Sequence, residues 1–167
     1  MINNDTTVLF YITDDVKLKD IDISPLYSMA KLKKLTMPYL KDRNDFNEFK
    51  KLKTLRISRT KVTSQAGIIA APALSSLSLI YRPHLKSISE INKLDNLSAS
   101  YLEKYNALRG LAVLEKNRSI EELFLADVNS VERVPAMFAL KIIKFCSLFD
   151  ESIEPLLDSE TLQQVDF

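Results

Sequence analysis

The side chains best suited to catalysis or metal binding are scarce in this sequence. His84 is its only histidine, Cys146 is its only cysteine, and only 2 of its 167 residues are glycine. A cysteine nucleophile needs a histidine within hydrogen-bond reach, and most zinc sites need several cysteines or histidines. The paired acids Asp14–Asp15 and Asp150–Glu151 have no further ligand at a metal-binding spacing, and two glycines leave little for a phosphate-binding loop. We therefore expect no enzyme activity, no metal and no cofactor.

Composition and charge point to an ordinary globular protein. Lys plus Arg number 23 and Asp plus Glu 22, which gives a net charge of +1 and argues against a dedicated nucleic-acid binder. Residues 1–5 lack the basic and apolar regions of a secretory signal, and no apolar run is long enough to span a membrane. A single cysteine suits a reducing compartment. We expect a cytoplasmic location.

A short apolar pattern, L-x-x-L-x-L, recurs along the chain. It begins at positions 32, 52, 74, 94, 120, 140 and 162, so that successive copies lie 20 to 26 residues apart. Six residues before each start the chain is apolar in all seven copies, and three residues before it in five, with Asn117 and Ser159 as the exceptions. Such regularity is typical of a repeat protein.

The spacing within each copy predicts its local structure. Apolar residues two apart, such as Leu123 and Leu125, are typical of a strand with one buried face, whereas residues three apart favour a helical or 3₁₀ connector. One such unit cannot bury its own apolar face, but stacked units can, and their strands then form one parallel sheet. His84 and Cys146 fall on repeats three and six, about 14 Å apart at the usual strand spacing, which makes a catalytic dyad between them improbable.

The pattern I-x-x-I-x-x-L-x-x-L-x-L resembles the short-helix class of the leucine-rich repeat family over residues 23–167. The resemblance implies an α/β solenoid of about seven parallel strands with short helical or 3₁₀ connectors, forming a single domain over residues 1–167. We expect residues 1–22 to cap the first repeat and residues 101–116, in the 26-residue unit, to form the longest helix. The family usually has Asn or Cys eight residues after each start, whereas here the chain has Leu40, Thr60, Arg82, Leu102, Val128 and Leu148. The turns after the strands must therefore be closed differently.

Residues at the second, fourth and sixth positions after each start should point away from the core. Ile80, Phe124 and Ile142 are apolar residues on this otherwise polar face, and Tyr39, Tyr81 and Tyr101 recur seven positions after a start. Tyr and Arg often anchor protein interfaces, although the tyrosines could equally pack over the strand ends. The predicted partner-binding residues are Lys34, Tyr39, Arg56, Arg59, Ile80, Tyr81, Tyr101, Phe124, Ile142 and Lys144.

Charge is segregated along the chain. Residues 31–61 carry 11 basic and 3 acidic side chains, whereas residues 90–167 carry 8 basic and 14 acidic ones. In a solenoid the order of residues is also their order in space, so this polarity would steer a charged partner. The alternative is that the lysines between 31 and 53 are solvated charges flanking Leu-rich strands.

These observations favour a non-catalytic protein-binding module. A small binder without an effector domain often acts as an inhibitor, and one example would be a bacterial immunity protein that neutralises a toxin domain. The alternatives are an adaptor or structural subunit that forms a homodimer through its C-terminal edge strand, and a nucleic-acid-contacting protein that uses residues 31–61. We expect no membrane partner, and nucleic acid is the less favoured ligand.

Overall fold

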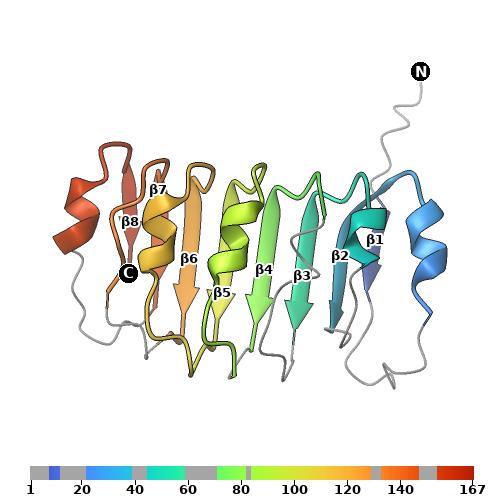
Figure 1. Cartoon of the computed structure of the whole chain (residues 1–167), viewed down its shortest axis with the longest axis horizontal. Coiled ribbons are helices and arrows are strands. Elements are labelled where there is room, and N and C mark those ends of the chain that lie inside the picture. The colour runs from blue at the N-terminus through green and yellow to red at the C-terminus, as the bar shows by residue number, and fades with distance from the viewer. Residues whose placement is uncertain are drawn as a thin grey trace.

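In the described residues, eight parallel strands form a single sheet in which strand order follows chain order from β1 to β8 (Figure 1). The computed structural model describes residues 8–11, 22–38, 45–58, 71–81, 84–128, 133–146 and 154–167. The strands are β1 (Val8–Tyr11), β2 (Leu32–Pro38), β3 (Thr54–Ser58), β4 (Ser76–Ile80), β5 (Ala99–Glu103), β6 (Glu122–Ala126), β7 (Ile142–Phe145) and β8 (Gln164–Asp166). No helix in these ranges is long and apolar enough to cross a membrane.

Alternation of apolar and polar residues fixes which face of each strand is buried. In β4, Leu77 and Leu79 are at most 1% exposed, whereas Ser76, Ser78 and Ile80 on the other face are partly exposed. The same alternation in the neighbouring strands joins their leucines and isoleucines into one hydrophobic core that runs the length of the sheet. Burying a Leu or Ile side chain contributes about 1.5–3 kcal/mol, so stacked repeats stabilise what one repeat cannot.

In the part of the chain that the structure describes, five 3₁₀ helices cover the core on one side of the sheet (Figure 1). They are η2 (Ser24–Ser28), η3 (Asp45–Glu48), η5 (Ser89–Lys93), η6 (Ala112–Lys116) and η7 (Glu154–Asp158). Each is one or two turns long, and residues three apart share a face, which is why an apolar residue every third position suffices to bury them.

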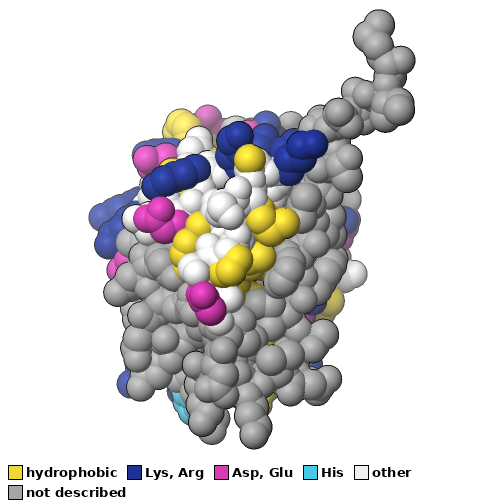
Figure 2. All heavy atoms as spheres, turned by 90° about the vertical axis from the view of Figure 1, so that its right-hand side faces the viewer, with side chains coloured by type: hydrophobic (Ala, Val, Ile, Leu, Met, Phe, Trp, Pro, Cys, Tyr) yellow, Lys and Arg dark blue, Asp and Glu magenta, His cyan; other side chains and the backbone are white. Residues whose placement is uncertain are grey.

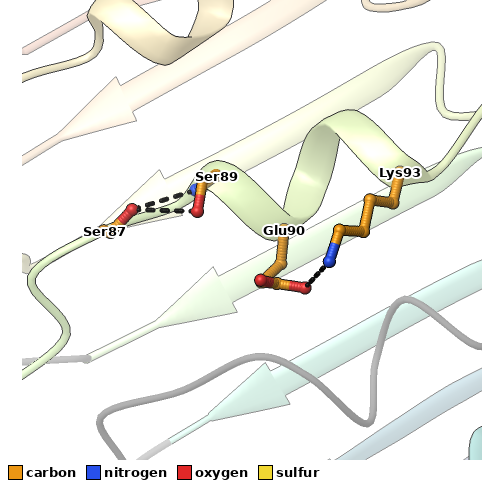
Figure 3. A network of polar contacts seen from close by, with 4 residues as sticks. All are labelled: Ser87, Ser89, Glu90 and Lys93. Atoms are coloured by element: carbon orange, nitrogen blue, oxygen red, sulfur yellow. Dashed lines mark hydrogen bonds and ion pairs between the residues drawn. The ribbon is translucent and has the colours of Figure 1, made fainter.

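Local polar contacts hold the short η5 helix in place. Ser87 Oγ accepts a hydrogen bond from the Ser89 backbone N–H at 3.2 Å, and its hydroxyl contacts that of Ser89 (Figure 3). One turn later Lys93 Nζ lies 3.0 Å from Glu90 Oε2, in an exposed ion pair. Such exposed pairs contribute little, so packing of Ile91 against the core stabilises η5 more than its surface contacts do.

The repeat expected from the sequence is confirmed, with one strand more than predicted. A strand occupies the end of each of the seven repeats, and the connectors are 3₁₀ helices as expected. The additional strand, β1, lies within the segment predicted to be the N-terminal cap and pairs in parallel with β2.

The predicted register of the fourth repeat is wrong by three residues. Leu77 pairs with Ser100 and Leu79 with Leu102, so this repeat begins at Leu97 rather than at Leu94. The two neighbouring starts, 74 and 120, then lie 23 residues away on either side. Leu94 fits the apolar pattern equally well because apolar residues continue every third position through Leu85–Leu97, and Ser100 occupies a core position where the pattern requires an apolar residue.

The helix predicted over residues 101–116 is also wrong. Tyr101 and Leu102 belong to β5, and only Ala112–Lys116 is helical, as η6. Buried residues recur here at intervals of three: Leu102, Tyr105, Leu108, Leu111 and Leu114. A period of three is that of a 3₁₀ helix, whereas an α-helix has about 3.6 residues per turn.

The turns after the strands close through the backbone where the family's polar residue is missing. Tyr81, Lys104 and Asp127, each seven residues after a repeat start, have left-handed φ values of 57°, 60° and 51°. The N–H groups of Tyr81 and Lys104 donate to the last carbonyl of the next strand, Glu103 O and Ala126 O, both at 2.9 Å. Beside Lys104 and Asp127, the position that usually holds Asn or Cys is occupied by the buried residues Tyr105 and Val128.

Two buried polar residues link neighbouring repeats on the connector side. Asn117 Nδ2 donates to Asn92 Oδ1 at 3.1 Å, and Asn117 Oδ1 accepts from the Ile120 N–H at 2.7 Å. Ser159 Oγ accepts from the Met137 N–H at 3.0 Å. These residues are the two polar exceptions in the row three positions before each start, and each satisfies backbone or amide groups that would otherwise be buried without partners.

Candidate functional site

The candidate site is the face of the sheet opposite the 3₁₀ helices, here called the open face. Two rows of side chains cross it from β2 to β8, and the pairing of the strands fixes which residues are neighbours. The first row is Lys34, Thr54, Ser76, Ala99, Glu122, Ile142 and Gln164; the second is Thr36, Arg56, Ser78, Tyr101, Phe124, Lys144 and Asp166.

A stacked pair of aromatic rings lies at the middle of the open face. The Tyr101 and Phe124 rings are parallel within 4°, with centroids 4.4 Å apart, and both side chains are partly exposed. Beside them is a hollow of about 220 Å³, whose walls include Ser76, Ala99 and Ile142. Small residues on β4 and β5 leave this space, and the two rings with Ile142 make its border apolar.

Hydrogen bonding fixes the orientation of Tyr101. Its hydroxyl donates to Glu103 Oε2 at 3.0 Å, on the same strand two residues along. Partial burial raises the pKa of the Tyr101 hydroxyl, and the hydrogen bond to the Glu103 carboxylate and its negative charge raise this pKa further. The hydrogen bond to Glu103 and the stacking on Phe124 restrict the orientation of the ring, which lowers the ordering cost of binding a ligand.

Charges on the two sides of the aromatic pair differ. Toward the N-terminus, Lys34 and Arg56 are exposed and form no ion pair within the described residues. Toward the C-terminus, Lys144 Nζ lies 2.7 Å from Asp166 Oδ2. Hydrogen bonds from Lys144 and Gln164 hold the pKa of Asp166 below its usual value. The face therefore offers unpaired positive charge on one side of the hollow and a neutralised pair on the other.

The structure brings four predicted site residues together: Tyr101, Phe124, Ile142 and Lys144 all line the hollow. Lys34 and Arg56 lie on the same face, on β2 and β3. Ile80 is partly exposed at the end of β4, and Tyr81 is 49% exposed in the turn that follows. Tyr39 and Arg59 fall outside the described residues.

The corrected register changes the role of several residues in the fourth repeat. Tyr101 lies in the second row of the open face, four residues after the repeat start, and Lys104 takes the turn position that the prediction gave to Tyr101. Ser100, predicted to face outward, is buried and only 4% exposed. Glu103, which orients Tyr101, was missed, and the register of β5 is the signal that would have found it.

The residues considered for chemistry lie apart. His84 is exposed in the turn region after β4, and Cys146 is exposed directly after β7, three strands further along the sheet. In the ranges that the structure describes, no three metal-binding side chains cluster together. Asp14–Asp15 and Asp150–Glu151 lie outside those ranges.

Comparison with known proteins supports the fold. No protein-family model and no curated protein matches the sequence. The structure is similar to internalin C2 of Listeria monocytogenes, with a TM-score of 0.64 and 20% identity over 86% of this chain and 65% of that one. It is also similar to the internalin InlF of the same organism, with a TM-score of 0.57 and 18% identity over 87% of this chain and 44% of that one. The chain thus spans less than two thirds of either structure.

These similarities confirm the predicted fold, a solenoid of parallel strands with 3₁₀ connectors of the leucine-rich repeat type. This fold is generally used for binding other proteins and is typically non-catalytic. At these identities the likeness extends to the fold alone.

Proposed function

We propose that this chain is a non-catalytic protein-binding module that holds its partner on the open face. The observation that carries the proposal is the stacked Tyr101–Phe124 pair beside its hollow. Aromatic side chains are enriched among the residues that dominate binding energy in protein interfaces, especially where they line a pocket near the centre of the contact. Here the pair is central on the sheet and its geometry is fixed before binding.

The partner expected from this geometry presents an apolar side chain to the hollow. Ile142 and the two rings would contact that side chain, while Lys144 and Glu122 at the border would contact polar groups around it. Arg56 on β3 and Lys34 on β2 lie two and three strands away from Tyr101 on β5, and would then face acidic groups of the partner.

We further propose that binding itself is the biological activity, as in an inhibitor that occludes its partner. A bacterial immunity protein that neutralises a cognate toxin domain is the specific form of this proposal. Cytoplasm is the proposed compartment, because the exposed, unpaired thiol of Cys146 suits a reducing environment.

Affinity capture from the native host tests the proposal. The tagged chain is compared with Phe124→Ala and with Phe138→Ala, a matched control whose ring is 67% exposed and lines a different hollow, which shares no residue with the open face. We expect the wild type and the Phe138 variant to retain one specific protein that the Phe124 variant loses by a factor of ten or more, since hot-spot truncations cost more than about 1–2 kcal/mol. Capture that is the same for all three variants, or no specific capture, would refute binding at the open face.

The inhibitor hypothesis has its own test. The captured protein is expressed alone and together with the wild type or the Phe124 variant, and growth or the captured protein's activity is measured. Inhibition that depends on the wild-type chain is expected. A captured protein whose activity is unchanged by saturating wild type would leave the binding module intact as a conclusion and exclude the inhibitor.

Self-association is a second candidate. Among the described strands β8 pairs with a neighbour on one side only, and Leu157 and Phe167 in the same repeat are 75% and 82% exposed. An unpaired strand edge beside exposed apolar side chains favours pairing with another strand. Sedimentation equilibrium at 100 µM protein would show a dimer, and a monomer at that concentration would contradict this candidate.

A further inference from the structure

Four exposed lysines crowd one border of the N-terminal end of the solenoid. This lysine rim consists of Lys31, Lys50, Lys51 and Lys53, from the residues that lead into β2 and β3. Figure 2 shows Lys and Arg side chains gathered along this end, next to a group of hydrophobic ones. None of the four forms an ion pair within the described part of the chain.

An apolar hollow of about 190 Å³ opens beside the lysine rim, between η2 and η3. Its walls include Leu26, Tyr27, Met29 and Phe49, with the Tyr27 and Phe49 rings edge to face at 4.9 Å. Lys50 and Lys51 form part of its border, and Glu48 is the one acidic residue among its lining residues. The hollow lies on the connector side of the sheet and shares no residue with the open face.

Protection of a sheet edge does not explain this concentration of lysines. β2 pairs with both β1 and β3, and β3 pairs with both β2 and β4, so neither strand presents a free edge. Lys50, Lys51 and Lys53 are exposed charges within one short segment, and an anionic ligand would reduce the repulsion between them.

We infer that this hollow and the lysine rim form a second binding site, which takes an acidic segment of a protein carrying one large apolar side chain. The apolar side chain fills the hollow, and carboxylates on either side of it contact the lysines. This inference does not rest on the proposed function of the open face.

Charge distribution favours a short acidic peptide segment over a nucleic acid. The basic cluster spans two adjacent repeats, about 5 Å apart, which matches a few carboxylates. A nucleic acid carries charge along its whole length, and residues 90–167, which follow in the same solenoid, are acidic by six charges. An apolar hollow also suits a side chain without polar edges.

Fluorescence anisotropy with a synthetic probe tests the inference. The probe is a labelled, end-blocked peptide of eight Glu residues around one central Phe, titrated with the intact chain at 20 mM and 300 mM NaCl. We expect saturable binding at low salt that weakens at high salt, because exposed charges are screened. A second peptide with Ala in place of Phe should bind more weakly, since it leaves the hollow empty.

Variants with opposite expected effects locate the site. Lys50→Gln/Lys51→Gln should weaken binding about fivefold and Glu48→Gln should strengthen it about twofold, from the usual worth of exposed charge pairs. Lys86→Gln/Lys116→Gln, which removes two exposed lysines elsewhere, is the matched control and should bind like the wild type. The three substituted side chains around the hollow, Glu48, Lys50 and Lys51, are exposed, so the fold is expected to survive each substitution.

Three outcomes would overturn the inference: no binding at 20 mM NaCl, binding that the Lys50/Lys51 variant retains, or tighter binding of a single-stranded oligonucleotide of equal charge. The last outcome would assign the rim to nucleic acid. Phe124→Ala should leave peptide binding unchanged. Loss of peptide binding and loss of partner binding at the open face are therefore separate results.

Discussion

Two buried serines differ in whether their hydroxyl groups are hydrogen-bonded, so the same substitution at each should change stability in opposite directions. Ser100 lies in register between Leu77 and Leu123 in the core, and its hydroxyl oxygen has no hydrogen-bond partner within the described residues. Ser159 is similarly buried, but its hydroxyl oxygen accepts a bond from the Met137 N–H. The same change, Ser to Ala, should therefore have opposite effects at the two sites.

The magnitudes follow from the state of each hydroxyl. An unsatisfied buried polar group costs about 1–3 kcal/mol, so Ser100→Ala should raise the free energy of unfolding by about 1 kcal/mol. Ser159→Ala removes a hydrogen bond and leaves the Met137 N–H without a partner. This change should lower the free energy of unfolding by about 1–2 kcal/mol. In a chain of this length, each kcal/mol corresponds to about 2–4 °C in Tm.

Urea unfolding followed by circular dichroism, together with calorimetry, measures both changes. Ser76→Ala, on the partly exposed face of β4, is the control and should fall within about 0.5 kcal/mol of the wild type. Comparison requires equal m-values, because repeat proteins can unfold in parts. If Ser100→Ala destabilises the protein by more than the control, the hydroxyl has a partner in solution and the reasoning from burial is refuted.

Three further predictions follow from single contacts. Lys104→Gly should raise Tm by a few degrees, because Lys104 has a left-handed backbone that costs a side-chain-bearing residue about 1 kcal/mol; an unchanged Tm would show that the turn is not strained. The pKa of Asp166, measured by NMR, should lie below 3.8 and rise in Lys144→Gln, so the stability from this pair is present above pH 3.8 and lost as pH falls through the lowered pKa. The pKa of Tyr101, measured by absorbance at 295 nm, should exceed 10 and should fall in Glu103→Gln. The contribution of the protonated Tyr101 hydroxyl to stability is present below pH 10 and is lost as pH rises through the raised pKa.

The sequence predicts most of this fold because its strongest signal is local and periodic. The pairs two apart in each repeat, such as Leu55 and Ile57, identify the strands, and the residues three apart identify the connectors. Prediction failed where three-residue periodicity ran without interruption into a strand, since Leu94 and Leu97 then fit the same motif position equally well. Only the pairing of Ser100 with Leu77 distinguishes the two.

That error propagated to the candidate site. A shift of three residues places Tyr101 in a turn instead of beside Phe124, so the stacked pair could not be predicted even though both residues were chosen as binding residues. The hollow between η2 and η3 was missed for a different reason. It is formed by side chains of two connectors, and its shape depends on how far apart they pack, which the sequence pattern does not encode.

The charge polarity read from the sequence becomes more specific once the pairs are placed. Acidic residues near the C-terminal end are partly neutralised by their own neighbours: Lys141 Nζ lies 2.9 Å from Glu121 Oε1, and Lys144 pairs with Asp166. The lysine rim and Arg56 have no such partners in the described ranges. Within the described residues, a cluster of unpaired positive charge therefore lies at β2 and β3, while the stacked Tyr101–Phe124 pair lies at β5 and β6. If the open face binds a partner as proposed, long-range attraction would draw acidic groups of that partner toward the first region, and short-range packing would hold it at the second. The polarity would then set the orientation in which the partner docks.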